Sequence, residues 1–586
     1  MERLSITAAA LPADQPTIRA PNKQSVLHRV KAMREYRRDY EERWKDIRDH
    51  QLPFIGEFGD TADATNKARR KDLMISNGVA WLANIAFAAG MESGLTPPSR
   101  QWFKFGFSNS SANEDMEAAS VLDIRQEIVE YMLHRSNFYN SIHSCYMEIA
   151  HGQAPLGVFA SPETGVRFQQ YTIGTYYLAS GASGRVDTFC REFQMTADQL
   201  LEQFGEENLP RAVKDALQNE GGRYNSFTTY WLVMPNRYRT VGQTGSKNMP
   251  YTSLYWIDKQ SVDEGKGFLF TGGFEEFPVP TARYQTIEGS PYGKGPGWYA
   301  EGDARMLQIM KKDFLTAVEL MVKPPMKGPA SVGDIGGVDL IPGGYTNLNN
   351  TGTNPTVEPL FQVPGNPEWL ATEIQRTEES IRRTYSADLF LMLDSIDTPQ
   401  MTAREVMERQ QEKLQQLGPV VERLQDEFLS PIIERVYNIA ERMGLFPPLP
   451  EELAERMADQ DIKIEYISPL AQAQKMSGLV NIEQAVSFAG QMAQIYPEAL
   501  KAIDPIGTVK RYFELLGAPA VMQRSTEEIM QMIAAEQEAM EQQQEQQYMM
   551  QQAQAMAPAA QAAKNLTDAA NDGNPALQNL LGIGGG

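Results

Sequence analysis

Residues 324–365 read PPMKGPASVGDIGGVDLIPGGYTNLNNTGTNPTVEPLFQVPG, a stretch that is dense in glycine and proline. Segments with helical periodicity flank it on both sides, at about 301–322 and 367–386. Because glycine and proline interrupt helices and strands, the stretch predicts a compact turn-rich module or a long structured excursion between two helices. This helix–insertion–helix organisation decides how the rest of the chain is interpreted.

The second of these helices has one apolar stripe and charged flanks. The stripe consists of Leu370, Ile374, Ile381 and Tyr385. Glu378 precedes Arg382 by four residues, and Glu379 precedes Arg383 by four, which predicts ion pairs on a solvated helix face. The alternative, in which both arginines face DNA, stays open at this point.

An apolar loop is predicted at 387–401. It contains Leu389, Phe390, Leu391, Met392 and Leu393, and it is closed by Asp394 and Asp397. Taken alone, such a run packs in a core more often than it lines a channel. Thr402 and Glu405 then have the spacing of a capping box, which predicts the start of a long helix ending at Gly444. Pro419 and Pro431 are expected to kink or restart that helix. Its apolar stripe, at three- and four-residue steps, consists of Leu417, Val421, Leu424, Phe428, Ile432, Val436, Ile439 and Met443.

The remainder of the chain predicts an α+β fold that is mainly helical. Helices are expected at about 25–52, 71–92, 113–135, 138–152 and 196–219. The region 155–290 is otherwise rich in strands, with clear examples at 157–160, 228–233 and 251–257. A short strand is expected at 461–467, and helical segments continue to about 523. Residues 524–563 are rich in Gln, Glu, Met and Ala and have good helix propensity, and the last twenty residues have the composition of a flexible tail.

Length and charge limit the classes of function. A chain of 586 residues is expected to form two to four domains at about 150 residues each. The formal net charge of −21 argues against a sequence-specific DNA-binding protein, but it allows a protein that lets DNA pass without gripping the phosphates. Cys145 and Cys190 are expected to be reduced thiols. No signal peptide or membrane span is expected, so we expect a soluble protein made in a cytoplasm.

A search for catalytic signatures favours a structural role. The stretch 289–295 resembles a phosphate loop, but it lacks the Ser or Thr after Lys294 and is one residue short. Glu148 and His151 have the spacing of half a carboxylate metal site, but no second copy exists, so we expect a pair on a helix surface. We therefore expect no catalytic residue, no metal and no cofactor.

Several passages together resemble the head-to-tail connectors, or portal proteins, of podoviruses. The N-terminal passages are Trp81-Leu82-Ala83, Gly94-Leu95-Thr96-Pro97-Pro98 with Trp102-Phe103, and Pro291-Tyr292-Gly293 with Gly295-Pro296-Gly297. The most specific block is Met401-Thr402-Ala403-Arg404-Glu405-Val406, Glu412, Leu417-Gly418-Pro419-Val420, Arg423-Leu424, Glu427 and Leu429-Ser430-Pro431-Ile432-Ile433, followed by Gly444 and Ile467-Ser468-Pro469-Leu470-Ala471-Gln472-Ala473-Gln474. The resemblance covers about residues 30–520, and the order and number of its passages make it specific.

The resemblance implies the portal fold, with a wing, a stem, a clip and a crown arranged in a ring around a central channel. The implied boundaries are a flexible N-terminal arm (1–24), a wing (25–300), a first stem helix (301–323), a clip (324–366), a second stem helix (367–386), a channel loop (387–401), a long wing helix (402–444), a crown (445–530) and a Gln/Glu-rich C-terminal segment with a flexible tail (531–586). In this context the apolar loop is expected to face the channel.

The resemblance also implies partners and site residues. About twelve copies form a ring at one capsid vertex of the virion, assembled in the host bacterial cytoplasm with scaffold and major capsid proteins. Double-stranded DNA passes through without specific contacts, and the ring docks terminase and later tail adaptor and tube proteins. The channel-loop residues named above and the stem residues Arg376, Arg382 and Arg383 are expected near DNA. The expected docking residues of the clip are Pro325, Lys327, Asp334, Asp339 and Tyr345.

Two competing functions are kept. An acidic internal or tail structural protein would bind partners without forming a channel, and it would not need the helix–clip–helix organisation. An enzyme is the third possibility, which ATP hydrolysis by the purified protein would support and the missing phosphate loop argues against.

Overall fold

The computed structural model describes residues 23–58, 74–107, 116–237, 239, 245, 248–257, 267–287, 289–329, 339–348, 357–360, 368–387, 417–448, 461–468, 482, 485–492, 496, 504–509 and 526–571. The chain divides into two compact units, of which the first comprises Met1–Asn109 with Ser120–Ser477. The second comprises Ser110–Ala119 with Gly478–Gly586. Among the described residues, no helix has both the length and the apolar character that a membrane span requires.

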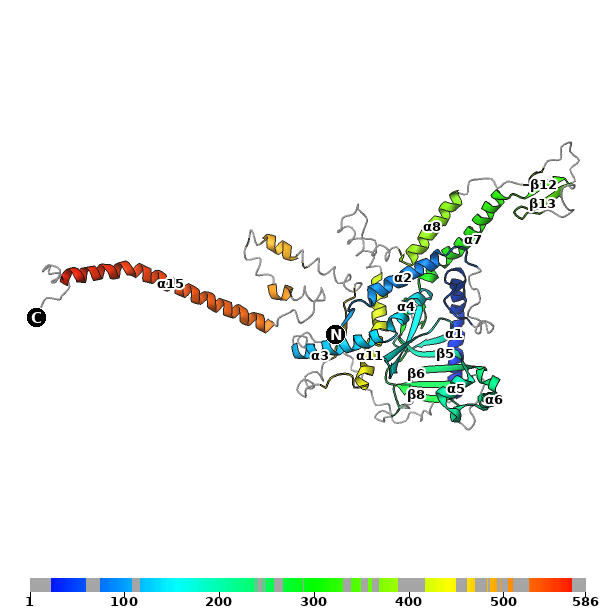
Figure 1. Cartoon of the computed structure of the whole chain (residues 1–586), viewed down its shortest axis with the longest axis horizontal. Coiled ribbons are helices and arrows are strands. Elements are labelled where there is room, and N and C mark those ends of the chain that lie inside the picture. The colour runs from blue at the N-terminus through cyan, green and yellow to red at the C-terminus, as the bar shows by residue number, and fades with distance from the viewer. Residues whose placement is uncertain are drawn as a thin grey trace. The chain divides into compact units, whose positions relative to one another are not determined.

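The described elements form a mainly helical α+β fold, as predicted (Figure 1). The helices discussed below are α1 (Lys23–His50), α2 (Val79–Leu95), α3 (Met116–Arg135), α4 (Phe138–Glu148), α5 (Ala197–Phe204), α6 (Arg211–Leu217), α7 (Pro296–Val322), α8 (Glu368–Thr384), α11 (Ser430–Arg442) and α15 (Thr526–Asn571). The strands are β1 (Phe103–Phe107), β2 (Gln153–Ser161), β3 (Gly165–Gln170), β4 (Tyr176–Ser180), β5 (Val186–Thr196), β6 (Ser226–Pro235), β7 (Tyr251–Ile257), β8 (Phe270–Phe274), β9 (Thr281–Arg283), β10 (Gln285–Thr286), β11 (Gly293–Lys294), β12 (Met326–Pro329), β13 (Tyr345–Leu348), β14 (Glu358–Pro359) and β15 (Ile462–Tyr466).

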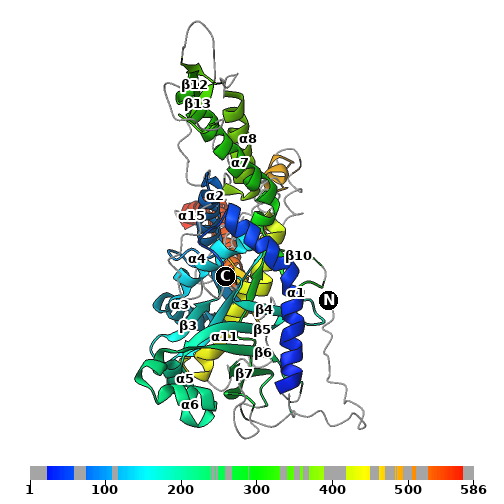
Figure 2. The same ribbon diagram turned by 90° about the vertical axis from the view of Figure 1, so that its right-hand side faces the viewer.

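A five-stranded antiparallel sheet is the centre of the strand-rich region. Its order is β4-β5-β6-β7-β8, and α1 packs on one of its faces (Figure 2). Val26, Val30 and Met33 recur at helical spacing, so they lie on one side of α1. They form a single buried cluster with Tyr177, Cys190, Tyr230, Leu232, Met234, Leu254 and Trp256 of the sheet.

The opposite face of this sheet carries the alternate residues of each strand, because successive side chains in a strand point to opposite sides. At one end of this face, α5 and α6 bury Met195 and Ile257. Elsewhere on the same face, Arg191, Trp231 and Tyr255 lie next to one another in register on β5, β6 and β7. A second, three-stranded sheet with order β3-β2-β9 also lies on this side, since Phe159 of β2 contacts Trp231 at 5.7 Å between ring centroids.

The prediction of a single helix at 196–219 is wrong, because two separate helices, α5 and α6, lie there. Thr196 caps α5 through a capping box with Gln199, but the helix stops at Gly205, whose φ of 72° is left-handed. Pro210 then precedes the separate helix α6. A glycine and a proline five residues apart therefore end one helix and start another.

The long helix predicted at 402–444 is described from Leu417 onward. Its predicted kink takes the form of a π-helical turn at Gln425–Leu429, directly before Pro431. Proline has no N–H to donate to the carbonyl oxygen four residues earlier, and its ring collides with that carbonyl. The backbone therefore widens, and its hydrogen bonds join residues five apart in place of four. The predicted apolar stripe is buried from Leu417 to Ile439, whereas Met443 is exposed.

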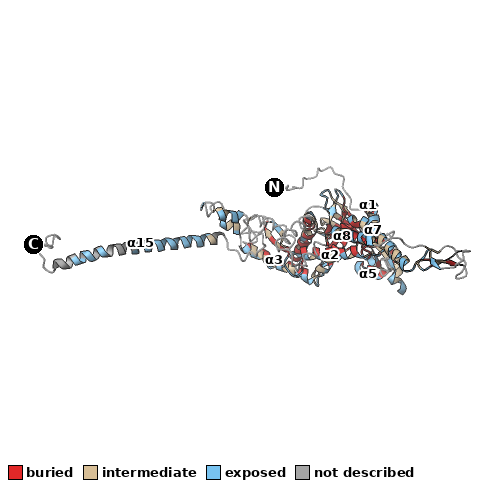
Figure 3. Cartoon of the chain, turned by 90° about the horizontal axis from the view of Figure 1, so that it is seen from above, coloured by how far each residue is buried: buried red, intermediate tan, exposed pale blue. Residues whose placement is uncertain are grey.

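The predicted strand at 461–467 is present as β15, and it pairs antiparallel with β1. These residues belong to the first unit, although the segment predicted as a crown, 445–530, includes them. In the second unit, most described side chains of α15 are exposed (Figure 3). Both cysteines are free and buried, which confirms the expected reduced thiols.

Candidate functional site: the paired helices and their terminal sheet

The first described residues of α7 are fixed by close contact with the turn that follows α4. Gly295 and Gly297 both approach this turn: a Cβ atom on Gly295 would lie 2.2 Å from the carbonyl oxygen of Ile149, and one on Gly297 would lie 2.8 Å from that of Ala150. Pro296 occupies the first helical turn, where its missing N–H has no role. The predicted first stem helix, 301–323, therefore begins earlier, at Pro296.

Helix α8 packs against α7 through the stripe that the sequence predicts. Ile374, Ile381 and Tyr385 are buried, together with Thr377, and Leu370 is partly buried. Ser380 Oγ also donates a hydrogen bond of 2.7 Å to Asp303 of α7. The two helices project from the rest of the first unit side by side, and both views show this arrangement (Figures 1 and 2).

Gln308 ties α7 to the N-terminal part of the chain. Its Oε1 accepts hydrogen bonds from the backbone N–H groups of Ser76 and Asn77, at 2.7 and 2.8 Å. Its Nε2 donates to the carbonyl oxygens of His50 and Asn77, at 3.0 and 2.9 Å. Because Gln308 is buried and uses both ends of its amide, it fixes the base of the helical pair.

The three arginines expected near DNA lie on the exposed side of α8 and pair with acids of the same helix. The nearest N–O distances are 3.5 Å for Arg376 with Glu373, 3.9 Å for Arg382 with Glu378 and 3.8 Å for Arg383 with Glu379. The two ion pairs predicted from the four-residue spacing are therefore confirmed. Pairs with this exposure contribute about 0.3–0.5 kcal/mol each, so their main effect is on local charge.

A small three-stranded sheet follows the far end of α7. Its order is β13-β12-β14, with β12 and β13 parallel and β12 and β14 antiparallel. The figures show it beyond the ends of the two helices (Figures 1 and 2). The turn-rich stretch at 324–365 is therefore, in its described part, a compact module built on short strands.

Four of the five expected docking residues lie in this module, and Asp334 lies outside the described residues. Pro325 is buried and its carbonyl accepts a hydrogen bond of 2.7 Å from Leu360 N–H. Lys327 pairs with Glu358 at 3.2 Å. Asp339 accepts from the N–H of Ile341 at 3.1 Å, and Tyr345 packs over Gly328. Pro325 and Asp339 thus hold the module together.

A group of exposed apolar side chains, which the sequence pattern does not predict, lies on this module and the adjoining helix ends. They are Met321, Val322, Leu340, Ile341, Val357 and Trp369. Trp369 is 71% exposed and Ile341 is 65% exposed. A group of apolar side chains left in water is typical of a surface that another chain covers. The signal in the sequence is the presence of such residues inside a Gly/Pro-rich stretch that has no periodicity.

The channel loop cannot be placed with these elements. Leu389, Phe390, Leu391, Met392, Leu393, Asp394 and Asp397 lie outside the described residues. Tyr385 directly follows α8 and is the last buried residue of the predicted stripe. Its hydroxyl donates a hydrogen bond of 2.8 Å to Gln51 Oε1. Tyr385 therefore anchors the chain immediately before the predicted loop.

The prediction of Glu148 and His151 as a helix-surface pair is wrong, because both are buried. Glu148 accepts hydrogen bonds of 2.8 Å from Gln170 Nε2 and 2.9 Å from the N–H of Ile173. Burial raises the pKa of Glu148 to about 8 and lowers the pKa of His151 to about 3. The sequence predicts one helix over 138–152, whereas α4 ends at Glu148 and a buried 3₁₀ turn follows at Ile149–His151.

The other candidate for chemistry is a structural hairpin. Within 289–295, β11 pairs with β10, and Gly293 lies so close to Gly152 that a Cβ atom would be 2.3 Å from its carbonyl oxygen. Among the described residues, no three His, Cys, Asp or Glu side chains gather as metal ligands would.

Comparison with known proteins identifies the family. The model of the bacteriophage head to tail connecting protein family matches residues 23–523. The chain is 32% identical to the portal protein of Salmonella phage epsilon15 over 96% of this chain and 98% of that protein. It is 31% identical to the probable portal protein of Bordetella phage BPP-1 over 84% and 87%. A solved chain from the neck of an empty gene transfer agent particle is 11% identical over 74% of this chain and 92% of that one, with a TM-score of 0.33, too low to add to the argument. The chain therefore belongs to the family of bacteriophage head-to-tail connecting proteins, the portal proteins, and its role is structural and not enzymatic.

Proposed function

We propose that this connector works as a ring of about twelve copies at one capsid vertex of the virion, enclosing a channel through which double-stranded DNA enters and leaves. The observation that carries the proposal is the projecting pair α7 and α8 with a small sheet at its end. Such a pair, repeated around an axis, gives a tube of helices with a ring of small sheets at one mouth. The helical pair is then the stem and the sheet module is the clip.

In this assembly the wing would comprise the two sheets with α1 and the long helix at 417–442. The five-stranded sheet and its covering helices provide a rigid body, and Gln308 connects that body to the stem. The segment after Ser477, which the chain keeps in a separate unit, is proposed as the crown, with α15 extending it. The N-terminal arm is proposed to precede α1, and since this helix begins at Lys23, the predicted arm of 1–24 is two residues too long.

The stem supports passage of DNA because its arginines are partly neutralised. Arg376, Arg382 and Arg383 are exposed, but each lies within 4 Å of a glutamate one turn away. Because these arginines are paired with glutamates, the stem surface attracts phosphate more weakly than unpaired arginines would. Each copy in the ring also adds a formal charge of −21. We propose that DNA slides along this surface without being held by it.

The clip module is proposed as the docking surface, first for terminase and later for the tail adaptor and tube proteins. Lys327 and Tyr345 are partly exposed, and the exposed apolar residues Leu340, Ile341 and Val357 lie in the same module. Apolar contact area beside a few charges is the composition of a protein–protein interface core with its rim. Scaffold and major capsid proteins are proposed to bind the ring elsewhere, during assembly in the host cytoplasm.

The channel loop at 387–401 is proposed to narrow the channel, with Asp394 and Asp397 near DNA. Its support is its position, directly after the buried anchor at Tyr385 that ends α8. A loop that begins at the base of the stem can reach the channel without displacing either helix.

Negative-stain electron microscopy of the purified full-length chain tests the ring. End-on class averages with about twelve units around an open centre, and a particle mass to match, are the expected result. Monomers or closed rods that persist at high protein concentration would contradict the proposal.

A further inference from the structure

A cavity of about 240 Å³ lies between the two sheets of the first unit, away from the stem and the clip. Its walls include Phe159 of β2, Arg167 and Gln169 of β3, and Arg191, Trp231 and Tyr255 of the five-stranded sheet. It opens on the face that α1 leaves uncovered. The cavity is therefore built from strands of two sheets, not from mobile side chains on one helix.

Strand register places the two arginines at the rim of an aromatic box. Arg191 pairs across the ladder with Trp231, Trp231 pairs with Tyr255, and Phe159 pairs with Arg167. Trp231 and Tyr255 stack with ring centroids 5.8 Å apart, and the indole N–H of Trp231 donates to Ser253 Oγ at 2.9 Å. These contacts preorganise the walls before any ligand arrives.

Neither arginine forms an ion pair with a described acidic residue, although the carboxylate of Glu57 attracts Arg191 from a longer distance. Arg191 lies over the rings of Tyr171 and Phe193, 5.0 and 4.4 Å from their centroids, and its Nε is buried without a hydrogen bond. Arg167 lies 6.0 Å from the ring centroid of Phe159. Burial lowers the pKa of Arg191. The hydroxyl of Tyr171, a side chain only 2% exposed, is also without a partner.

This absence of partners is unusual for the molecule. The chain has 75 acidic residues against 54 lysines and arginines, so carboxylates are plentiful. Its most buried arginines find one: Arg283 binds Glu427 and Arg435 binds Glu276, both within 3 Å. Arg191 is partly buried, and its Nε is shielded from solvent with no hydrogen-bond partner among the described residues, which destabilises a fold, so this guanidinium points to a ligand that supplies negative charge. Arg167 is exposed and lines the same cavity, so it adds positive charge at the rim.

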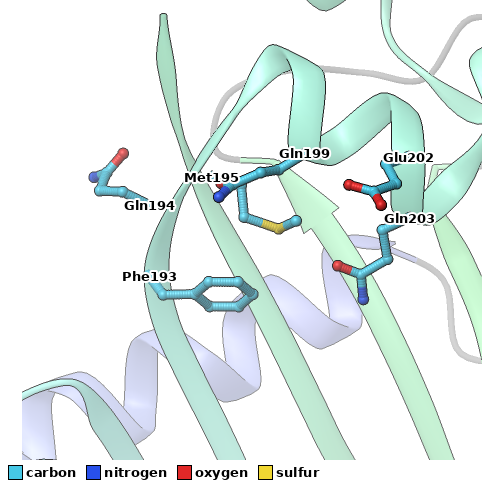
Figure 4. A pocket seen from close by; sticks show the side chains of 6 residues that line it. All are labelled: Phe193, Gln194, Met195, Gln199, Glu202 and Gln203. Carbon is cyan, nitrogen blue, oxygen red and sulfur yellow. The ribbon is translucent and has the colours of Figure 1, made fainter. Parts of the chain in front are cut away.

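The cavity continues into a second hollow under α5, with a volume of about 540 Å³. Phe193 and Gln203 line both spaces, and Gln194, Met195, Gln199 and Glu202 line the second (Figure 4). Because Glu202 would repel a carboxylate, the acidic residue of a bound chain belongs in the first hollow, beside the arginines. Figure 4 shows Phe193 of β5 and Gln203 of α5 pointing into the space between strand and helix. Glutamine amides can both donate to and accept from a peptide backbone, so the two hollows form a groove suited to an extended chain.

We propose that this groove binds an extended acidic peptide segment of a partner protein, with one aspartate or glutamate carboxylate held between Arg167 and Arg191. Planar guanidinium groups match a carboxylate, and the aromatic walls exclude water from the pair. An apolar side chain next to the carboxylate packs against Trp231 or Tyr255. A nucleic acid fits less well, because a backbone of successive phosphates would meet a chain with a net charge of −21.

Fluorescence anisotropy with the full-length chain and two labelled peptides tests the proposal. The probes are acetyl-Gly-Phe-Glu-Phe-Gly and its isostere acetyl-Gly-Phe-Gln-Phe-Gly, each with a C-terminal fluorescein. The glutamate peptide should bind at least about tenfold more tightly than the glutamine peptide. R191M and R167Q should each weaken the glutamate peptide about tenfold or more. R211Q, which removes an exposed arginine of α6, should leave it unchanged.

A thermal melt separates binding from folding. Because Arg191 is partly desolvated and has no partner, R191M should melt at the same temperature as the wild type or higher. A lower melting temperature together with lost binding would mean that Arg191 only supports the fold, and it would overturn the proposal. So would equal affinity for both peptides, no binding at about 1 mM, or binding of a ten-residue oligothymidylate that R191M abolishes. None of these outcomes bears on whether the chain forms rings.

Discussion

Arg283 and Glu427 form a bidentate ion pair, with Nε 2.7 Å from Oε2 and Nη2 2.8 Å from Oε1. Arg283 is on β9 and Glu427 is in the π-helical turn before Pro431, so the pair joins the three-stranded sheet to the long helix. Two further guanidinium N–H groups donate to the carbonyl oxygens of Ser290 and Gly184. The irregular turn before Pro431 is thus held by a buried pair in which four of the five arginine N–H groups form hydrogen bonds.

Breaking this pair should destabilise the first unit. E427Q leaves the buried guanidinium of Arg283 without its counter-charge, so the free energy of unfolding should fall by about 3 kcal/mol. The neighbouring pair of Asp426 with Arg185, at 2.6 Å but more than half exposed, is a matched control. D426N should change the free energy by less than about 1 kcal/mol. Urea unfolding followed by circular dichroism measures both, and equal losses would contradict the role of the buried pair.

The start of α7 should tolerate no side chain at Gly295. G295A places a Cβ atom against two backbone carbonyl oxygens at 2.2 and 2.5 Å, so we expect a loss of about 3 kcal/mol in unfolding free energy. Gly302, about two turns later, has open space around it. G302A should stabilise the helix by about 0.5–1 kcal/mol. Melting temperatures of the two variants should therefore move in opposite directions.

Glu148 should make stability depend on pH above neutrality. Its pKa in the folded protein is raised from 4.5 to about 8, so the folded state holds a proton that the unfolded state has already lost. The unfolding free energy should consequently fall as the pH rises from 4.5 to 8, and level off beyond. Relative to E148Q, the wild type should lose about 2 kcal/mol between pH 6.5 and 8.5. Urea titrations at both pH values would contradict this if the difference between the two proteins stayed constant.

The exposed apolar residues of the clip module should serve docking and not folding. I341S removes a side chain that is 65% exposed, so the unfolding free energy should change by less than about 0.5 kcal/mol. Co-sedimentation of rings with the large terminase subunit of the same phage should nevertheless weaken several-fold. Y224S, at a side chain 77% exposed next to α6, is the control that should leave docking unchanged. Equal docking by both variants would remove Ile341 from the interface.

The channel loop can be tested by deletion. Removing 389–394 should leave rings intact, because α8 ends in its own buried anchor at Tyr385. Heads made with this variant should package DNA but lose it on storage, which nuclease digestion after a holding period measures. Heads that keep full-length genome would rule out a role for this loop in retention.

Local pattern was enough to predict much of the fold. The apolar stripes on α8 and on the helix after Leu417 are buried as their spacing indicates, because residues three and four apart lie on the same face of a helix. The pairs Glu378–Arg382 and Glu379–Arg383 follow from helical geometry in the same way. The predicted helix start at 196 also agrees with α5, which begins at Ala197.

Features that depend on tertiary contact could not be predicted. Glu148 is the last residue of α4, and it is buried where the 170–173 segment packs against it and donates hydrogen bonds to its carboxylate. Arg167 and Arg191 are ordinary alternating residues of two strands, and only the packing of one sheet on the other brings them to one cavity. The sequence of the clip module has no helical or strand periodicity, so it does not predict which of its apolar residues are exposed.

A cryo-electron microscopy reconstruction of the purified full-length ring tests the central claim most directly. The account predicts that α7 and α8 of every copy line the open channel, with the sheet of β12, β13 and β14 at one mouth. A ring whose channel is lined by the five-stranded sheet, with the helical pair on its outer surface, would contradict it.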